Sequence, residues 1–471
     1  MEHSKTEVVV IGGGPGGYAA AFYAADLGKQ VTLVEMDRLG GVCLNRGCIP
    51  SKALLHATKM IVEARESAHR GISFGEAKVD LDKLRAWKNG ILEKLTGGVA
   101  MIAQKRGVQV LAGRGHFEDA RTLRVETAGG QRFLKYDQAI VAVGSVPALP
   151  RAFDLANPRI MTSTEALEVP DIPERLLVVG GGYIGMELGT VYATLGSRVT
   201  MIETLDTILA GADADLVRPV QHYAQKAFQE LRTKAKVLQM STAGRQIRVV
   251  SERDGKQVEE FYDRVLVSVG RRPNADGLGL ENTGVERDEK GFIKVDDNLQ
   301  TTQPGIYAIG DIAGGLLLAH KASREARIAV EHLCEGAPGH RDFIVPAVVF
   351  TDPEVAWAGL TEAEAKAKGV EFEVAKFPWG ASGRALTFDR VDGLTKLIIE
   401  PGTERILGVG LVGHGAGELI GEAVVALEMG ASVSDLAHCV HAHPTLSETL
   451  MEAAEAYFGH STHTLPRKRT A

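Results

Sequence analysis

The chain has 471 residues, a length that suggests about three domains of roughly 150 residues each. Its formal net charge of -7 gives no basic surface for nucleic acid, and its 45% hydrophobic residues suit a globular protein with large cores. The sequence contains no uninterrupted run of about 18 apolar residues, so it predicts no membrane span. A strand pattern starts at Val8 and leaves no room for a signal peptide. With only 4 cysteines and no export signal, we expect a reducing cytoplasm, where a persisting disulfide would be catalytic.

The first predicted unit is a strand, a glycine-rich turn, a helix and a second strand. A strand at residues 8–11 precedes Gly12, Gly14 and Gly17, a helix at 18–27 follows, and a strand at 31–34 ends in Glu35. Gly12 allows the tight turn, Gly14 lets a pyrophosphate approach the helix N-terminus, and Gly17 lets the helix pack on the sheet. Glu35 can accept hydrogen bonds from ribose hydroxyls. The complete series predicts a dinucleotide site.

Residues 40–52 contain two of the four cysteines, Cys43 and Cys48, directly before Pro50 and an apolar-periodic helix at 53–65. Proline suits a first helical turn, so Cys48 is expected at a helix N-terminus, where unpaired N–H groups and the helix dipole favour a thiolate. Cys43 is close enough in sequence to form a disulfide with it. The pattern predicts a redox-active pair; a structural disulfide or two ordinary buried thiols are the alternatives.

The strand–turn–helix–strand series occurs a second time, offset by a constant number of residues. A strand at 176–179 leads into Gly180, Gly182 and Gly185, a helix reaches residue 195, and the next strand ends in Glu203. Two such units, with a dithiol motif after the first, predict two dinucleotides and electron transfer between them. No arginine follows Glu203 to bind a 2′-phosphate, so the sequence favours NAD over NADP.

Between and after these units we expect four segments: 1–150, 151–275, 276–344 and 345–471. The first holds a long amphipathic helix at 81–105, alternating strands at 108–135, and a strand and glycine turn at 139–145; prolines then mark a linker. A strand and turn at 265–274 close the second segment, and a strand at 301–312 ends in Gly310-Asp311. The fourth segment mixes short strands and helices, including one at 361–368 with a Thr361/Glu364 capping box, and resembles an interaction domain.

The segment GGVCLNRGCIPSK closely resembles the active site of the class I flavin disulfide reductases, the dihydrolipoamide dehydrogenases in particular, and the resemblance covers essentially the whole chain. It implies an α/β fold with two Rossmann-like domains, for FAD and NAD, and a C-terminal α+β dimerisation domain. The third segment would complete the FAD site. The implied FAD-binding residues are Gly12, Gly14, Gly17, Glu35, Lys52, Gly115, Gly144, Asp311 and Ala319, and the implied NAD-binding residues are Gly180, Gly182, Gly185, Glu203, Gly270 and Arg271.

The same resemblance assigns the chemistry. Cys43 would exchange with the substrate, Cys48 would lie beside the flavin, and Lys52 and Glu187 would form a buried ion pair near the flavin ring. His443, in the HPTLSE segment near the C-terminus, would be the base, and Glu448 would orient it, both supplied across a homodimer. The implied reaction oxidises dihydrolipoyl groups and reduces NAD. The implied partner is a lipoyl-bearing domain of a 2-oxoacid dehydrogenase or glycine cleavage type complex, with no nucleic acid, membrane or metal involved.

Some positions and functions stay open. Arg46 stands where the family usually has valine; its charge would lower a thiol pKa or favour an anionic substrate, or else it points to solvent. His441 is interpreted as structural, and Cys334 and Cys439 as inert core residues. The competing functions are another NAD(P)H-dependent flavin disulfide reductase with a different disulfide substrate, and a mainly structural subunit of a lipoyl complex.

Overall fold

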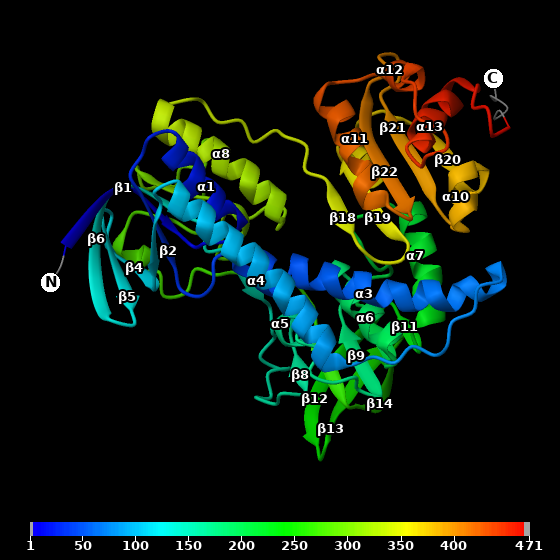
Figure 1. The fold of residues 1–471 in the computed structure, drawn as a ribbon, viewed down its shortest axis with the longest axis horizontal. Helices are drawn as coiled ribbons and strands as arrows, with labels where there is room; N and C mark the ends of the chain where they lie inside the picture. Colours follow the sequence, from blue (N-terminus) through cyan, green and yellow to red (C-terminus); the bar gives the residue numbers. More distant parts are fainter. Residues whose placement is uncertain (1–2, 466–471) are drawn as a thin grey trace.

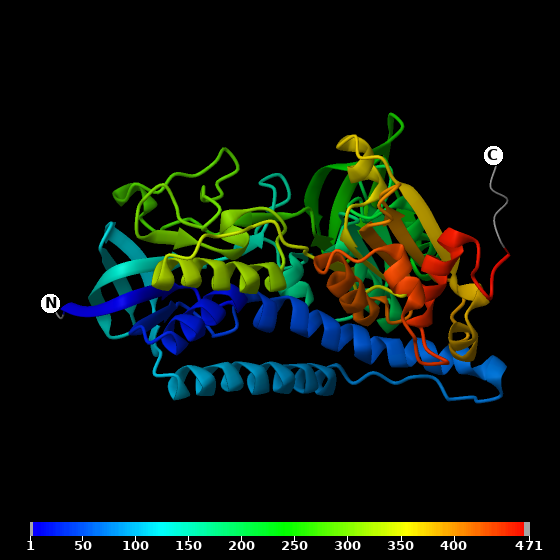
Figure 2. The ribbon, with the colours of Figure 1, turned by 90° about the horizontal axis from the view of Figure 1, so that it is seen from above.

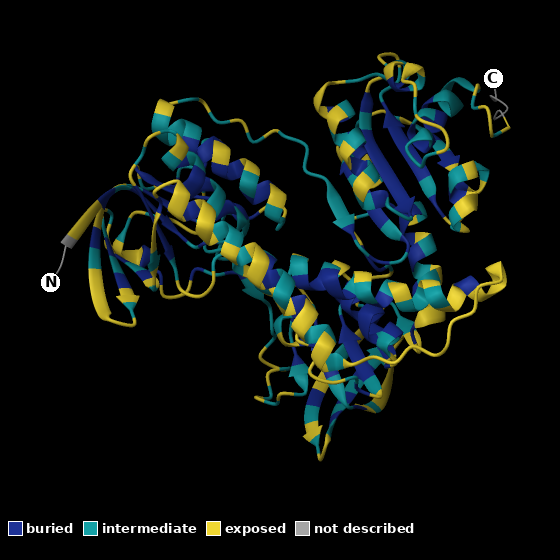
Figure 3. Cartoon of the chain, viewed as in Figure 1, coloured by how far each residue is buried: buried dark blue, intermediate teal, exposed yellow. Residues whose placement is uncertain are grey.

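The computed structural model describes residues 3–465 and contains three sheet-centred units arranged along the chain (Figure 1). Buried residues concentrate on the strands inside each unit, and exposed residues lie on the outer helix faces, the loops and outer strands such as residues 256–262 (Figure 3). Among the described residues, no helix is both long enough and apolar enough to cross a membrane. The mixed α/β fold expected from the sequence is confirmed.

The first sheet has seven strands in the order β3-β2-β1-β6-β5-β4, with β17 paired to β6. Its strands are β1 (His3–Ile11), β2 (Val31–Glu35), β3 (Gln109–Ala112), β4 (Arg114–Asp119), β5 (Thr122–Thr127), β6 (Gly130–Val141) and β17 (Ile306–Ala308). Its helices are α1 (Pro15–Asp26), α2 (Gly41–Arg46), α3 (Cys48–Glu66), α4 (Leu81–Lys105) and α8 (Ala319–Glu335), with 3-10 turns η1 (Ser67–Arg70) and η3 (Gly310–Ala313). Helix α4 runs along one side of the molecule beside α3 (Figure 2).

The strand predicted at 301–312 is wrong in length. Only Ile306–Ala308 is a strand, and it pairs in parallel with β6 of the first sheet. Gly305 and Gly310 have φ angles of 84° and 75°, in the left-handed region, so the backbone turns at both ends. The chain thus returns to the first sheet after the second unit and brings Asp311 with it.

The second unit has a five-stranded sheet in the order β11-β10-β9-β15-β8 and a three-stranded antiparallel sheet β12-β13-β14. Its strands are β8 (Ile160–Met161), β9 (Arg175–Val179), β10 (Arg198–Ile202), β11 (Glu230–Arg232), β12 (Ala235–Ala243), β13 (Gln246–Arg253), β14 (Lys256–Tyr262) and β15 (Arg264–Val267). Its helices are α5 (Ser163–Ala166), α6 (Tyr183–Leu195) and α7 (Ala214–Ala227). A short ribbon of β7 (Ser145–Pro147) and β16 (Arg271–Pro273) joins the first and second units, and η2 (Leu280–Asn282) follows.

The two glycine-rich turns have the same geometry. Gly12 and Gly180 have φ angles of 101° and 106°, and a Cβ on either would lie 2.4 Å from a carbonyl oxygen of the neighbouring strand end. A Cβ on Gly17 would lie 1.8 Å from the Gly12 carbonyl oxygen, and one on Gly185 would lie 2.0 Å from the Gly180 carbonyl oxygen. Both distances are far shorter than a van der Waals contact. Only glycine fits these positions, as the sequence predicts for a helix packed tightly on its sheet.

The C-terminal unit is a five-stranded antiparallel sheet in the order β18-β19-β22-β21-β20. Its strands are β18 (Ala347–Val349), β19 (Glu354–Gly359), β20 (Glu373–Pro378), β21 (Leu394–Ile399) and β22 (Ile406–Gly413). Its helices are α9 (Glu362–Ala367), α10 (Gly383–Phe388), α11 (Ala416–Glu428), α12 (Val433–His438) and α13 (Glu448–Phe458), with the 3-10 turn η4 (Trp379–Ala381). The Thr361/Glu364 capping box is present at α9, as predicted.

The central strands of this sheet are buried on both faces. Along β19, Val355 belongs to the core shared with the second unit, whereas Ala356 and Ala358 belong to the core under α11 and α13. Along β22, Val412 faces the second unit and Leu411 the C-terminal helices. Because successive side chains of a strand point to opposite faces, one sheet joins the two cores.

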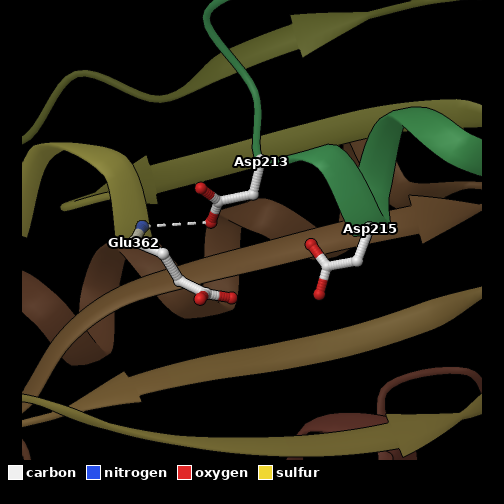
Figure 4. Close-up of side chains that lie close together, drawn as sticks. All are labelled: Asp213, Asp215 and Glu362. Carbon is white, nitrogen blue, oxygen red and sulfur yellow. Dashed lines mark hydrogen bonds between the residues drawn. The ribbon is translucent and has the colours of Figure 1, made fainter.

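A buried charge network joins the same two units. Asp213 and Asp215 lie at the start of α7 and Glu362 at the start of α9, with their carboxylates close together (Figure 4). The ammonium of Lys396, on β21, lies 2.6, 2.7 and 3.1 Å from these three carboxylates and its side chain is 0% exposed. Burial lowers the pKa of Lys396, but its hydrogen bonds to Asp213 and Asp215 raise it above the ordinary value. A lysine ammonium therefore fills the space that a cation would take.

Lys396→Met should lower the free energy of unfolding by about 3–5 kcal/mol, because it leaves the Asp213 carboxylate without its cation, whereas Asp215 keeps Lys376, whose Nζ lies 2.5 Å away. Lys366→Met is the matched control: its ammonium lies 3.7 Å from Glu362 but is 69% exposed, so its loss should cost less than about 1 kcal/mol. Urea titration measures both values. Equal stabilities of the two variants would show that Lys396 is not a structural link.

Candidate active site

The two cysteines lie at the junction of α2 and α3. Cys43 is in α2, Gly47 separates the helices, and α3 begins at Cys48, as the sequence predicts. Both cysteines are thiols in this structure and line one cavity. The Cys43 thiol donates a hydrogen bond to Cys48, which lowers the pKa of Cys48 to about 7 against the opposing effect of burial; Lys52 lowers it further. The same hydrogen bond and burial raise the pKa of Cys43. The pair is thus chemically unequal, and Cys48 is the more acidic thiol.

The cavity extends from the end of β2 to the facing ends of α3 and α6. Of the predicted residues, it is lined by Gly12, Gly14, Glu35, Cys43, Cys48, Lys52, Gly115, Gly144, Glu187, Arg271, Asp311 and Ala319. Gly17, Gly180, Gly182, Gly185, Glu203, Gly270, His443 and Glu448 lie outside it. The first fingerprint, the dithiol and the returning Asp311 segment therefore share one space.

Lys52 and Glu187 form the ion pair that the sequence leads us to expect. Lys52 Nζ lies 3.0 and 2.9 Å from the two carboxylate oxygens of Glu187, whose side chain is 4% exposed. The backbone N–H of Phe350 donates to the same carboxylate at 3.0 Å, and the Phe350 ring lies 4.4 Å from Lys52 Nζ. The Lys52 ammonium is thereby held on α3 one helical turn after Cys48.

Asp311 is held by two residues from the β7–β16 ribbon. Ser145 Oγ donates a hydrogen bond to the Asp311 carboxylate. Arg271 donates to Ser145 Oγ and to the Ser145 carbonyl, each at 2.7 Å, and its Nε lies 3.9 Å from Asp311. The Arg271 side chain, expected at the NAD site, is therefore directed at the Asp311 side of the cavity.

The residues present fit a flavin dinucleotide. A Cβ on Gly144 would meet nothing within 4 Å, and one on Gly14 would meet only Gly41, at 3.8 Å, so both backbones leave room for a ligand. Asn45 lines the cavity, and its buried Oδ1 has no hydrogen-bond partner, as expected of an acceptor awaiting a hydroxyl donor. Glu35 accepts from the N–H groups of Gly13 at 2.6 Å and Asp37 at 2.8 Å, which fixes its carboxylate at the end of β2.

The second fingerprint repeats this arrangement. Glu203 accepts from the N–H groups of Gly181 at 2.6 Å and Leu205 at 2.8 Å. The first turn of α6, with Tyr183 and Glu187, lines the dithiol cavity although Gly180 and Gly182 do not. The helix that follows the second fingerprint therefore lines the same cavity as the first fingerprint.

His443 and Glu448 form a pair in the C-terminal unit. His443 Nδ1 lies 2.9 Å from a Glu448 carboxylate oxygen, and the Thr445 N–H donates to the other oxygen at 2.7 Å. Burial raises the pKa of Glu448, but the Thr445 and His443 hydrogen bonds outweigh it, so the pKa is lowered and the carboxylate is ionised. The imidazole is 72% exposed and does not line its own chain's cysteine cavity.

His441, two residues earlier, is structural in its contacts. Its Nε2 lies 2.6 Å from a Glu422 oxygen and its Nδ1 3.0 Å from the Cys439 carbonyl, so both ring nitrogens already contact groups of their own chain. Cys334 is half-buried in the first core, and burial raises its pKa. Cys439 is exposed, so the expectation that it is a core residue is wrong.

Arg46 lines the same cavity as the thiols, but its side chain is paired with a carboxylate. Its guanidinium forms an ion pair with Asp37, just after β2, with both side chains about half exposed. The charged groups that shift the pKa of Cys48 are Lys52 and Glu187. The sequence could not indicate this pairing, because it depends on where α2 lies relative to the end of β2.

Sequence reasoning missed three residues at this site: Ser145, Phe350 and Asn45. Ser145 follows the predicted Gly144 turn and was within reach of sequence inference. Phe350 acts through a backbone N–H, which any residue supplies, so no side-chain pattern could reveal it. Asn45 stands between the cysteines and its amide donates to the Leu39 and Gly41 carbonyls, at 3.1 and 3.0 Å.

A dinucleotide-binding turn and a dithiol in one cavity, which the helix after a second such turn also lines, define a flavin-dependent disulfide oxidoreductase. Residues 6–326 match the family described as pyridine nucleotide-disulphide oxidoreductase, and residues 345–454 match its dimerisation domain. The chain belongs to this family, and the expected fold class, disulfide oxidoreductase activity and cofactors, FAD and NAD, are thereby confirmed.

Individual proteins are similar over nearly the full length. Dihydrolipoyl dehydrogenase of Vibrio parahaemolyticus is 45% identical over 467 residues, 99% of this chain and 98% of that protein. Dihydrolipoyl dehydrogenase of Thermus scotoductus is 46% identical over 466 residues, 98% of this chain and 99% of that one. Among solved structures, LpdA of Mycobacterium tuberculosis superposes with a TM-score of 0.88 at 31% identity, covering 96% of this chain and 99% of LpdA. The Cu(II) complex of the flavoprotein disulfide reductase RclA of Escherichia coli gives 0.86 at 28% identity, with coverages of 96% and 99%.

Cys48 should titrate near pH 7 in the reduced protein and lose its thiolate as the pH falls below that value. Cys43→Ala removes the hydrogen-bond donor and should raise the pKa of Cys48 toward the ordinary thiol value of about 8.5. Lys52→Met should raise it as well. The pH dependence of Cys48 alkylation, followed by mass spectrometry of the peptide, measures all three proteins.

Arg46→Val is the matched control for these substitutions, because the Arg46 guanidinium is paired with Asp37. Its alkylation profile should coincide with that of the wild-type protein. A profile that moves with Arg46→Val but not with Cys43→Ala would contradict the assignment of the groups that set the thiol pKa.

Proposed function

We propose that this protein is an NAD-dependent dihydrolipoyl dehydrogenase, which oxidises protein-bound dihydrolipoyl groups to lipoyl groups and reduces NAD. The observation that carries the proposal is the unequal Cys43–Cys48 pair, placed in one cavity with the first fingerprint, Asp311 and the start of α6. The similarity to dihydrolipoyl dehydrogenases, at about 45% identity over nearly the whole chain, selects this dithiol over other disulfide substrates.

FAD would be held by Gly12, Gly14, Glu35, Ser145, Asp311 and the start of α8, and when bound it supplies a two-electron carrier between the dithiol and NAD. NAD would lie along Gly180, Gly182, Gly185 and Glu203. Residues 1–150 then form the FAD-binding segment, 151–275 the NAD-binding segment, 276–344 the segment that completes the FAD site, and 345–471 the dimer interface.

The dithiol substrate needs a base, because the thiolate is the attacking species. His443 accepts the substrate thiol proton at Nε2, since Nδ1 is bonded to the Glu448 carboxylate, which stabilises the resulting imidazolium. The exposed His443 does not line its own cysteine cavity, so we propose that a second subunit of a homodimer presents it there.

The oxidised pair reacts by thiol–disulfide exchange. The substrate thiolate attacks Cys43 Sγ, the Cys43–Cys48 bond breaks, and Cys48 leaves as a thiolate. The low pKa of Cys48, beside Lys52 and at the start of α3, makes it the better leaving group. The second substrate thiol then attacks the substrate sulfur of the mixed disulfide and closes the lipoyl ring, and its proton passes to the departing Cys43 sulfur, which is released as a thiol. The substrate has lost two electrons and two protons, and the cysteine pair holds the electrons.

The physiological partner would be a lipoyl-bearing domain of a 2-oxoacid dehydrogenase or glycine cleavage type complex. We place the enzyme in the reducing cytoplasm, where a dithiol pair of this kind can cycle. A steady-state assay of NADH formation from dihydrolipoamide tests the activity. NADH formation that requires Cys43 and Cys48 supports it; a protein that reduces other disulfides with NADH but leaves dihydrolipoamide unreacted would favour a different reductase.

His443→Gln should lower kcat for dihydrolipoamide oxidation by about a hundredfold to ten-thousandfold, because a neutral amide cannot accept the thiol proton. His441→Gln is the matched control and should keep most of the rate, since both His441 nitrogens are already bonded. Reduction of the enzyme by NADH, which needs no substrate thiol, should be unchanged in both. A larger loss with His441→Gln would reassign the base.

Mixed dimers test whether the site needs two subunits. Cys43→Ser and His443→Gln homodimers should both be inactive. Random reassociation of the two should restore about a quarter of the wild-type rate, because half the dimers are mixed and each has one complete site. If the mixture stays inactive although subunits have exchanged, His443 acts within its own chain or not at all.

A further inference from the structure

Behind the cavity, α8 holds an ion pair that the proposed chemistry does not use. Lys321 Nζ lies 3.0 Å from Glu325 Oε1, and the two side chains are 5% and 0% exposed. Arg341 approaches the same oxygen at 3.6 Å. Such a pair is costly to bury, and apolar residues of the same size would often stabilise a core as well. Its contacts therefore indicate a further role.

Both members of the pair bond to the turn that contains Asp311. Glu325 Oε2 accepts a hydrogen bond from the Gly310 N–H at 2.7 Å. Lys321 Nζ donates to the carbonyls of Gly314 at 2.6 Å and Gly310 at 3.3 Å. Gly310 and Gly314 have φ angles of 75° and 76°, in the left-handed region, so the turn reverses at each end. Apolar side chains could satisfy none of these backbone groups.

The turn and α8 both face the cavity. Asp311 lies between the two anchored glycines, and Ala319, the first residue of α8, lines the same cavity. Lys321 and Glu325 lie near the start of α8 and form hydrogen bonds with the backbone of residues 310–314. The ion pair thus connects the 310–314 turn to α8, and the Asp311 carboxylate in this turn accepts a hydrogen bond from Ser145.

We propose that Lys321 and Glu325 are positioning residues for the dinucleotide: by holding both ends of the 310–314 turn, they fix the Asp311 carboxylate and the start of α8 against the cofactor. This inference rests on the proposed function only in taking the dinucleotide of this cavity to be FAD. It extends the binding site to two residues that do not line the cavity.

The experiment measures the rate at which purified holoprotein releases FAD on dilution, by the rise in flavin fluorescence. Glu325→Gln keeps an acceptor for the Gly310 N–H but removes the charge that holds Lys321, and should speed release on the order of tenfold. Glu331→Gln is the matched control on α8, at a residue bonded to Tyr23 instead, and should release FAD at the wild-type rate.

A double-mutant cycle shows whether the pair acts through Asp311. If it does, Glu325→Gln should have little further effect when Asp311→Asn is already present. Additive effects, or wild-type release by Glu325→Gln, would overturn the inference. Wild-type protein that binds no FAD would instead overturn the proposed cofactor site, and this inference with it.

The Lys321→Met, Glu325→Gln double variant removes both charges and keeps the measurement informative if the single variant fails to fold. Its thermal stability should return toward the wild-type value, because no unpaired charge stays buried. Its FAD release should stay fast, because the Gly310 and Gly314 carbonyls have lost their donor. Recovery of FAD retention in parallel with stability would show that the pair is merely structural.

Discussion

The hydrogen bond between Cys43 and Cys48 organises the chemistry of this protein, because it makes two identical side chains different. Cys48 begins α3, with Lys52 one turn later, and its pKa falls to about 7. Cys43, the donor, keeps its proton. One sulfur is then suited to leave and stay charged, and the other to be attacked. A redox pair of two equivalent thiols would have no such direction.

Helix α3 connects this pair to the rest of the molecule. Its Lys52 is tied to Glu187 on α6 of the second unit, and the Phe350 N–H beside β18 completes the carboxylate's contacts. Farther along, Lys59 Nζ lies 3.1 Å from His414 Nδ1, at the end of β22. The helix that begins with Cys48 therefore contacts both the second unit and the C-terminal unit. The buried Lys396 network holds those two units together, so that the cysteine pair and the second fingerprint have fixed positions relative to each other.

Much of this arrangement could be predicted from local sequence. The glycines at 12, 17, 180 and 185 predict tight turns and close helix–strand packing, because a larger residue does not fit at these positions. The start of α3 at Cys48 followed from Pro50, and the length of α4 from its apolar period. Contacts between distant segments could not be predicted in the same way. The Arg46 pairing depends on where α2 lies relative to the end of β2, and the contacts of the Phe350 amide and of Arg271 with Ser145 depend on how separate units pack. No periodicity of the sequence indicates these contacts.

In the proposed reaction, the Cys43–Cys48 pair passes electrons from a dithiol to NAD. The first measurement is an anaerobic titration of the oxidised holoprotein with dihydrolipoamide, followed by addition of NAD. We expect one equivalent of dihydrolipoamide to reduce the enzyme and NAD then to yield about one equivalent of NADH, with neither step in Cys48→Ser. An enzyme that NADH reduces but dihydrolipoamide does not would contradict the assigned substrate. Full transfer in Cys48→Ser would contradict the role of the cysteine pair itself.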